Sequence, residues 1–224
     1  DNDLSMEWRT NFIRTFLERD LRNFGFDIPA DMLNRLWKML AHNNGQLLNY
    51  RQLSNSMGTS DTSIRKYIDI LANTYMLRIL HPYASNLKKR LVKSPKVYIR
   101  DTGILNALLK LDDMNEMLSH PSYGGSWELL CLENIIQHYP QFEPSFFRSS
   151  NGNEIDLILT KGNQKIAFEF KASTTPKVTR GFWTALDDIN ATKAFIIAPV
   201  RMPYPYKDDV WVYPINDFLS LKIS

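Results

Sequence analysis

The sequence predicts an α+β protein in two parts. A helical region containing a winged helix-turn-helix is expected over residues 1–117, and an αβββαβ domain with α/β layers over residues 118–224. Two observations carry this prediction. Apolar residues recur at helical spacing through most of the first part, whereas short strand-like apolar runs alternate with helical segments in the second. The acidic stretch Asp112–Glu116 is expected to be the linker between the parts.

The composition is that of a folded protein from a reducing compartment. Of the 224 residues, 44% are hydrophobic and 23% charged, which excludes wholesale disorder. The single cysteine, Cys131, excludes an internal disulfide framework and favours a cytoplasmic location. The longest apolar run, residues 194–200, is too short to span a bilayer, and no secretory signal is visible. Because the chain does not begin with Met, we expect it to be a piece of a longer protein.

Helices dominate the predicted first part. Aromatic and leucine residues at helical spacing indicate an amphipathic helix over Glu7–Phe24. Asp31 is expected to cap a second helix that stops near Gly45. A further short helix is predicted over Asp101–Leu111, just before the acidic linker. These segments supply enough apolar surface for a helical core.

Two short helices around a glycine predict the helix-turn-helix. Asn49 precedes Gln52 by three residues, as in a capping box for a helix over Tyr50–Met57. Gly58 then ends this helix, and Ser60 can cap the next one. Helix, glycine-containing turn and helix form the pattern of a helix-turn-helix.

A basic loop follows the helix-turn-helix. Strands are predicted at Met76–Leu80 and Lys96–Ile99, which would make the loop between them a wing. Its region, together with the second helix, holds the expected DNA contacts Arg65, Lys66, Lys88, Lys89, Arg90 and Lys93. No acidic residue occurs between Asp69 and Asp101, and basic loops contact phosphates in this way. A solvated loop, or a contact to an acidic neighbouring domain, is the alternative.

The predicted second part alternates helices and strands. A two-residue Gly-Asn turn at 162–163 is expected to join two strands in a hairpin. The predicted helices are Ser126–His138, Arg180–Ile189 and Asp217–Leu221, and the predicted strands are Phe146–Arg148, Glu154–Thr160, Lys165–Lys171, Ala194–Ala198 and Val210–Tyr213.

The hairpin carries the one constellation of residues that predicts chemistry. Asp156 lies within an apolar strand, and Glu169 and Lys171 share one face of the next strand. Two converging carboxylates with open water positions suit Mg²⁺ or Mn²⁺, and a nearby Lys can orient water or stabilise transition-state charge. Glu128 or Glu133 of the preceding helix could complete the shell. A solvated Glu-x-Lys face, with Asp156 as an edge or turn residue, is the alternative.

Several other chemistries lack their motifs. The four histidines show no zinc spacing, and no serine lies in a GxSxG turn. Cys131 lies among leucines and is expected to be a core thiol. The absence of a GxxxxGK(S/T) loop predicts that this chain has no ATPase activity of its own.

Specific runs of sequence resemble a known family. They are Trp8–Asp20, Gly45–Asn49, Pro82–Asn86, Lys89–Arg90, Lys93–Lys96 and Asp101–Gly103. They are similar to the C-terminal half of prokaryotic AAA-type ATPases, a domain of unknown function that follows the P-loop module. The resemblance implies an upstream ATPase module as partner, and ATP would bind only to that module. The sequence does not predict whether the protein forms an oligomer.

The second part also resembles the PD-(D/E)xK restriction-endonuclease-like superfamily. Gly124–Glu128 looks like its glycine-led helix with a first acidic residue, Glu154–Asp156 matches the hairpin aspartate, and Glu169–Lys171 matches the (D/E)xK tripeptide. The QxxxY element and the motif's proline are absent. The resemblance implies DNA binding with metal-dependent phosphodiester hydrolysis by Glu128, Asp156, Glu169 and Lys171, with Arg148 and Lys177 on phosphate. An inert nuclease-fold module that recognises DNA or a protein partner for the ATPase is the alternative.

Overall fold

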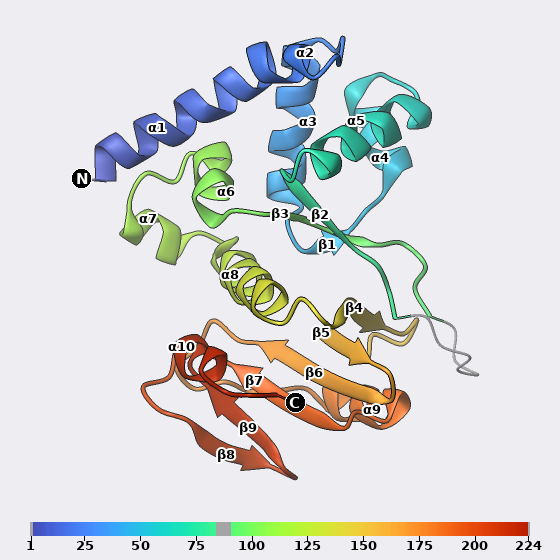
Figure 1. The fold of residues 1–224 in the computed structure, drawn as a ribbon, viewed down its shortest axis with the longest axis vertical. Coiled ribbons are helices and arrows are strands. Elements are labelled where there is room, and N and C mark those ends of the chain that lie inside the picture. The colour runs from blue at the N-terminus through green and yellow to red at the C-terminus, as the bar shows by residue number, and fades with distance from the viewer. Residues whose placement is uncertain (1, 84–90, 224) are drawn as a thin grey trace. The chain divides into compact units, whose positions relative to one another are not determined.

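A computed structural model of the chain describes residues 2–83 and 91–223 (Figure 1). The chain divides into two compact units that interleave along the sequence. The first consists of Asp1–Ile79 and Lys96–Leu129, and the second of Leu80–Pro95 and Leu130–Ser224. Each unit has its own sheet, so the expected α+β class is confirmed. The predicted boundary between residues 117 and 118 remains a prediction about sequence domains.

The first unit begins with a long helix that contains a π-helical turn. Elements α1 (Asn2–Thr15), η1 (Phe16–Asp20) and α2 (Leu21–Asn23) follow one another without a break, because Thr15 and Leu21 are both helical. Phe16 and Leu17 of the π-helical turn are buried, and the Phe16 ring lies 5.6 Å from that of Trp37. Packing of this apolar stripe therefore holds the helix on α3 (Ala30–His42).

Two capped helices and a small sheet complete the centre of the first unit. Helix α4 (Tyr50–Met57) begins where the Asn49 side chain accepts a hydrogen bond from the Gln52 N–H at 3.0 Å. Helix α5 (Asp61–Asn73) is capped by Ser60, and Gly58 between the helices has φ +64°. The predictions for these caps and for the turn are confirmed. The strands β1 (Gln46–Leu47), β2 (Leu77–Leu80) and β3 (Lys96–Ile99) form a sheet in the order β1-β3-β2.

The predicted acidic linker is wrong. After α6 (Thr102–Leu109), the Asp113 side chain accepts hydrogen bonds from the N–H groups of Asn115 and Glu116, and so caps α7 (Met114–Ser119). An acidic residue at a helix N-terminus satisfies free N–H groups and complements the helix dipole. The acidic run therefore starts a helix. Asp31 also differs from expectation, because α3 begins after Pro29 and has no side-chain cap.

The second unit is built on a six-stranded mixed sheet. Its order is β4-β5-β6-β7-β9-β8, with β6, β7 and β9 parallel and the other neighbours antiparallel. The strands are β4 (Glu143–Arg148), β5 (Glu154–Lys161), β6 (Gln164–Phe170), β7 (Lys193–Ile197), β8 (Tyr204–Lys207) and β9 (Val210–Tyr213). The helices are α8 (Tyr123–His138), which enters from the first unit's sequence, α9 (Arg180–Ile189) and α10 (Ile215–Leu219). Sequence patterns predicted every one of these except β8.

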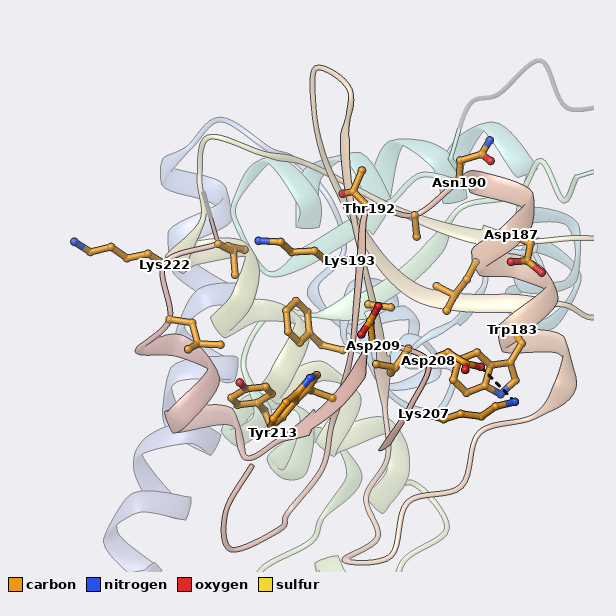
Figure 2. Close-up of a pocket in the computed structure, with 18 residues that line it drawn as sticks. Trp183, Asp187, Asn190, Thr192, Lys193, Lys207, Asp208, Asp209, Tyr213 and Lys222 are labelled. Carbon is orange, nitrogen blue, oxygen red and sulfur yellow. Dashed lines mark ion pairs between the residues drawn. The ribbon is translucent and has the colours of Figure 1, made fainter. Parts of the chain in front are cut away.

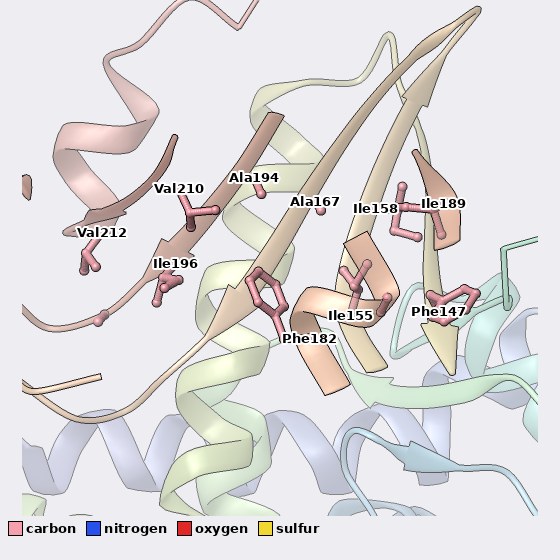
Figure 3. Close-up of a cluster of buried hydrophobic side chains, with 12 residues drawn as sticks. Phe147, Ile155, Ile158, Ala167, Phe182, Ile189, Ala194, Ile196, Val210 and Val212 are labelled. Atoms are coloured by element: carbon pink, nitrogen blue, oxygen red, sulfur yellow. The ribbon is translucent and has the colours of Figure 1, made fainter. Parts of the chain in front are cut away.

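Helices cover both faces of this sheet. On one face, Phe182 of α9 packs in a buried cluster with residues such as Ile158 and Ala167 (Figure 3). On the other, the ring of Phe168 lies 5.2 Å from that of Phe218 in α10. Neighbouring residues of a strand point to opposite faces, so Ala167 and Phe168 place α9 and α10 on opposite sides. Across the described residues, no helix is long and apolar enough to cross a membrane.

Candidate active site

The predicted hairpin is confirmed and brings Asp156 to the E-F-K tripeptide. Strands β5 and β6 pair antiparallel, with Leu157 opposite Phe168, around a turn in which Gly162 has φ +57°. This register continues toward Asp156 on one strand and Glu169 on the other. Because directly opposed residues of an antiparallel pair are near neighbours, this register puts Asp156 and Glu169 on adjacent strands at the open end of the hairpin.

A β-bulge lies at the aspartate. Ser145 pairs with Ile158 and Phe147 with Ile155, so Phe146 of β4 faces two residues of β5, Asp156 and Leu157. A bulge re-aims side chains and is frequent beside active sites. It also explains how Ile155 and Ile158, three residues apart, both join the cluster beneath α9. The bulge therefore turns Asp156 out of the alternation of its strand.

Both carboxylates make polar contacts with β6 or the residue that follows it. Asp156 Oδ2 accepts a hydrogen bond from the Phe170 backbone N–H at 2.9 Å, between Glu169 and Lys171 in sequence. Lys171 Nζ donates to Glu169 Oε1 at 2.6 Å, which is short for a charge-assisted hydrogen bond. Glu169 is 7% exposed, so its charge depends on this close cation. The structure thus brings Asp156, Glu169 and Lys171 together.

Glu128 has its contacts in the first unit. Its Oε1 accepts a hydrogen bond from the Tyr98 hydroxyl at 2.6 Å and lies 3.4 Å from Lys96 Nζ. Tyr98 and Lys96 are both buried on β3. Glu133, the other glutamate of α8 considered from sequence, is also buried. These contacts do not test the sequence-based prediction that Glu128 belongs to the hairpin's site, and they favour a structural role for it.

The expected DNA contacts are spread over both units. Arg65 and Lys66 are exposed on α5, where the Arg65 guanidinium lies 3.8 Å from the centre of the Tyr50 ring. Lys93 and Lys177 are exposed in the second unit, and Arg148 forms an ion pair with Glu154 at 3.6 Å. The predicted contacts Lys88, Lys89 and Arg90 lie outside the described residues.

The donors fit a hard divalent cation that keeps several waters. In the described parts of the chain, no group of three or more His, Cys, Asp or Glu side chains could hold a metal ion. Mg²⁺ is commonly bound through one or two carboxylates and completes its octahedron with water and phosphate oxygens. Asp156 and Glu169 supply two carboxylates of that kind. They are the residues that would hold Mg²⁺ or Mn²⁺.

A large surface cavity lies elsewhere in the second unit. It measures about 980 Å³, and Figure 2 shows Trp183 and Asp187 from α9, with Asp208 and Asp209 from the β8–β9 turn. Both turn residues have positive φ, 48° and 62°, as a two-residue hairpin turn requires. Sequence reasoning missed this hairpin, although two residues between alternating segments are its usual signal. None of the predicted site residues lines this cavity.

Comparisons with known proteins match two successive parts of the chain. Residues 1–115 match the family described as Domain of unknown function (DUF8612), and residues 123–218 match Domain of unknown function (DUF4143). DUF4143 is known from AAA-ATPase-associated proteins.

Two relatives extend these matches. The uncharacterized proteins Rv2008c of Mycobacterium tuberculosis and Mb2031c of Mycobacterium bovis are each 36% identical over 219 residues, which is 98% of this chain and 50% of each relative. The chain therefore spans about half the length of the curated relatives it matches. The DUF8612 match covers residues 1–115, more than half of the chain. The chain therefore belongs to the DUF8612 family.

Proposed function

We propose that the second unit is a divalent-metal-dependent nuclease acting on DNA. The observation that carries this proposal is the hydrogen bond at a β-bulge from the Phe170 N–H to Asp156 Oδ2 at 2.9 Å, because Phe170 lies between Glu169 and Lys171 in sequence. A bulge, a buried carboxylate and an adjacent ammonium together are features of sites that perform chemistry.

The chain's own residues would divide the work. Asp156 and Glu169 would hold the cation, since hard divalent ions prefer carboxylate oxygens. Bound Mg²⁺ or Mn²⁺ supplies a water of lowered pKa and neutralises charge on the phosphate. Lys171, 2.6 Å from Glu169 Oε1, would stabilise the negative charge that develops on the phosphate or orient the attacking water.

The fold of each unit supports the same proposal. The second unit runs α8, three antiparallel strands, α9 and a parallel strand, which is the αβββαβ order expected of a restriction-endonuclease-like domain. The first unit runs α3, β1, α4, α5, β2 and β3 with the sheet order β1-β3-β2, an arrangement suited to a winged helix. We propose that DNA is the shared partner of both units.

An ATPase module is part of the proposal for the whole protein. DUF4143 is known from AAA-ATPase-associated proteins, and the relatives are about twice as long as this chain. We propose that such a module precedes these units in the full-length protein and drives or gates the site. ATP would bind there, and the chain of 224 residues would not hydrolyse it.

An inert recognition module is the second candidate, and one observation favours it. Asp156 and Glu169 each have an oxygen occupied within the chain, by the Phe170 N–H and by Lys171 Nζ. Contacts of that kind could serve only to stabilise carboxylates that are partly removed from water. In that case the second unit would recognise DNA or a protein partner for the ATPase without cutting.

Cleavage of branched, single-stranded and duplex DNA with Mg²⁺ and Mn²⁺ separates the two candidates. We expect Asp156→Asn to abolish metal-dependent cleavage, because it removes a charge that the cation needs and keeps the side chain's shape. Lys171→Ala should lose about 10²–10³-fold in rate. Asp208→Asn is the matched control, because it makes the same chemical change at an exposed turn and should cleave like the wild type.

Cleavage that survives in both site variants would exclude this site. No cleavage of any DNA form by the wild type, in either the 224-residue chain or the full-length protein, would favour the inert module.

A further inference from the structure

Residues on both sides of 84–90, in the connection between β2 and β3, form backbone hydrogen bonds with β4 of the second unit. Before residues 84–90, the Tyr83 N–H donates to the Phe146 carbonyl at 2.7 Å, and the Phe146 N–H donates to the His81 carbonyl at 3.1 Å. After them, the Val92 N–H donates to the Arg148 carbonyl at 3.0 Å. Both ends of this basic segment therefore pair with β4, whose Phe146 is the residue opposite the bulge at Asp156.

Two segments contact the end of β4 and the turn that follows it, one beginning at Leu91 and one at the start of α9. Leu91 forms an antiparallel bridge with Ser149, the first residue after β4. From α9, Gly181 approaches so closely that a Cβ there would lie 3.3 Å from the Asn153 Cα. The segments at 91–93 and 179–181 thus both pack on the turn between β4 and β5.

Each of these three segments, β4 included, carries a cation in or directly beside a contacting residue. Lys93 and Arg180 are exposed, and the Arg148 side chain is 36% exposed. The facing anion is Glu154, which pairs with Arg148 at the long distance of 3.6 Å and is itself partly exposed. A half-exposed pair of this kind is weak, so a phosphate can replace the carboxylate at Arg148.

The turn lies close to the proposed site along β5. Glu154 and Asp156 are two residues apart, and a strand rises 3.2–3.4 Å per residue, so the separation is roughly 7 Å. One strand of duplex DNA carries a phosphate for about every 3.4 Å of helix axis. Because the backbone winds around the axis, neighbouring phosphates are farther apart in space than this rise, so an anion held at the turn is about one phosphate from the carboxylates.

We propose that Lys93, Arg148 and Arg180 form a site on the β4–β5 turn that binds the phosphate backbone of DNA next to the position of cleavage. This inference rests on the proposed function, and it assigns the end of the basic segment to the nuclease unit instead of a wing. The group that this site would bind is the phosphodiester, and the partner that supplies it is duplex DNA.

Binding of a fluorescent DNA duplex in EDTA tests this proposal without any cleavage. We expect the triple variant Lys93→Ala, Arg148→Ala, Arg180→Ala to flatten the log–log salt slope by about 0.9 for each lost phosphate contact. Between 50 and 200 mM salt, the wild type should then lose about 40-fold more affinity than the variant. The matched control changes three exposed lysines of the same unit, Lys193, Lys207 and Lys222, to Ala and should keep the wild-type slope.

A second variant guards against misfolding of the first. Glu154→Gln removes the anion that competes for Arg148, so we expect tighter duplex binding with a steeper salt slope. Equal slopes in both triple variants, with unchanged binding by Glu154→Gln, overturn the proposal even if the wild type cleaves DNA. The expected slopes without cleavage would instead uphold this site and count against the nuclease.

Discussion

The two units each pair a glutamate with a lysine, and the two pairs are built differently. In the first unit, Glu128 accepts a 2.6 Å hydrogen bond from Tyr98 and lies 3.4 Å from Lys96. In the second unit, Glu169 has Lys171 of its own chain segment at 2.6 Å, and the Asp156 carboxylate is held on the residue between them. One glutamate ties a helix to a sheet. Glu169 lies next in sequence to the backbone N–H that binds the Asp156 carboxylate.

This difference separates a structural charge from a candidate functional one. A carboxylate held by a tyrosine and a lysine of a buried strand has little freedom to take a cation as well. Two carboxylates at an open hairpin end repel each other unless a cation lies between or beside them. We therefore expect Glu128 to serve stability and the pair Asp156 and Glu169 to serve binding.

The largest expected effect is the loss of stability in Glu128→Ala. Removing this carboxylate leaves Lys96, which is 3% exposed, without this anion; breaking a fully buried pair costs about 3–5 kcal/mol, and this partly exposed pair should cost somewhat less. Urea unfolding followed by circular dichroism measures the free energy of unfolding. Glu128→Gln should cost less, because its amide oxygen still accepts from the Tyr98 hydroxyl.

Cleavage by the Glu128 variants tests the other prediction for this residue. If Glu128 were a metal ligand, Glu128→Gln would lose cleavage while remaining folded. We expect the folded Glu128→Gln protein to keep Mg²⁺-dependent cleavage, unlike Asp156→Asn. A stable Glu128→Ala protein without cleavage would contradict the comparison drawn between the two glutamates.

Sequence patterns predicted the first unit well where the signals are local. The caps Asn49 and Ser60 and the turn at Gly58 all act within a few residues, and each is where the pattern placed it. Local signals failed at Asp113, because a run of acidic residues is typical of a linker as well as of a helix start. Strand β1 was missed because its two residues pair with β3, about fifty positions away in sequence.

In the second unit, the hairpin could be predicted and the bulge could not. Alternation and the Gly-Asn turn predict the β5–β6 pairing and hence the meeting of Asp156 with Glu169 and Lys171. The bulge depends on how β4 pairs with β5, and no local sequence pattern predicts it. The attachment of residues 81–83 and 91–92 to β4 is also non-local, so the sequence predicted a wing or a loop for the basic segment and not its pairing with β4.

The next effect is a metal-dependent rise in the melting temperature of the second unit. At ten times the dissociation constant, a cation that binds only the folded state adds about 1.4 kcal/mol. For a protein of this size, that is a rise of roughly 3–6 °C with Mg²⁺ or Mn²⁺. Asp156→Asn should melt at or above the wild-type apo temperature and show no rise, and Asp208→Asn should respond like the wild type. A wild-type melting temperature indifferent to both metals would remove the cation from the proposal.

The smallest effect compares one tyrosine from each unit at high pH. Burial raises the pKa of Tyr139, whose hydroxyl donates to the Leu221 carbonyl at 2.9 Å. Burial also raises the pKa of Tyr50, but there the Arg65 guanidinium opposes the rise. As the pH passes the ordinary value of 10.0, the unfolded chain releases the Tyr139 proton first, so the free energy of unfolding falls.

Tyr139→Phe should therefore be less stable than the wild type by about 1 kcal/mol at pH 8, because it loses one hydrogen bond. The difference should shrink as the pH rises through 10 and beyond, since the phenylalanine cannot ionise. Urea unfolding between pH 8 and 11 measures both, and contributions from other titrating groups cancel in the difference between the two proteins. Tyr50→Phe is the counterpart in the first unit, and its difference should change with pH in the same direction, because burial and Asp69 raise the Tyr50 pKa against the opposing Arg65. A constant Tyr139→Phe difference across this range would show that burial does not hold the Tyr139 proton in the folded state.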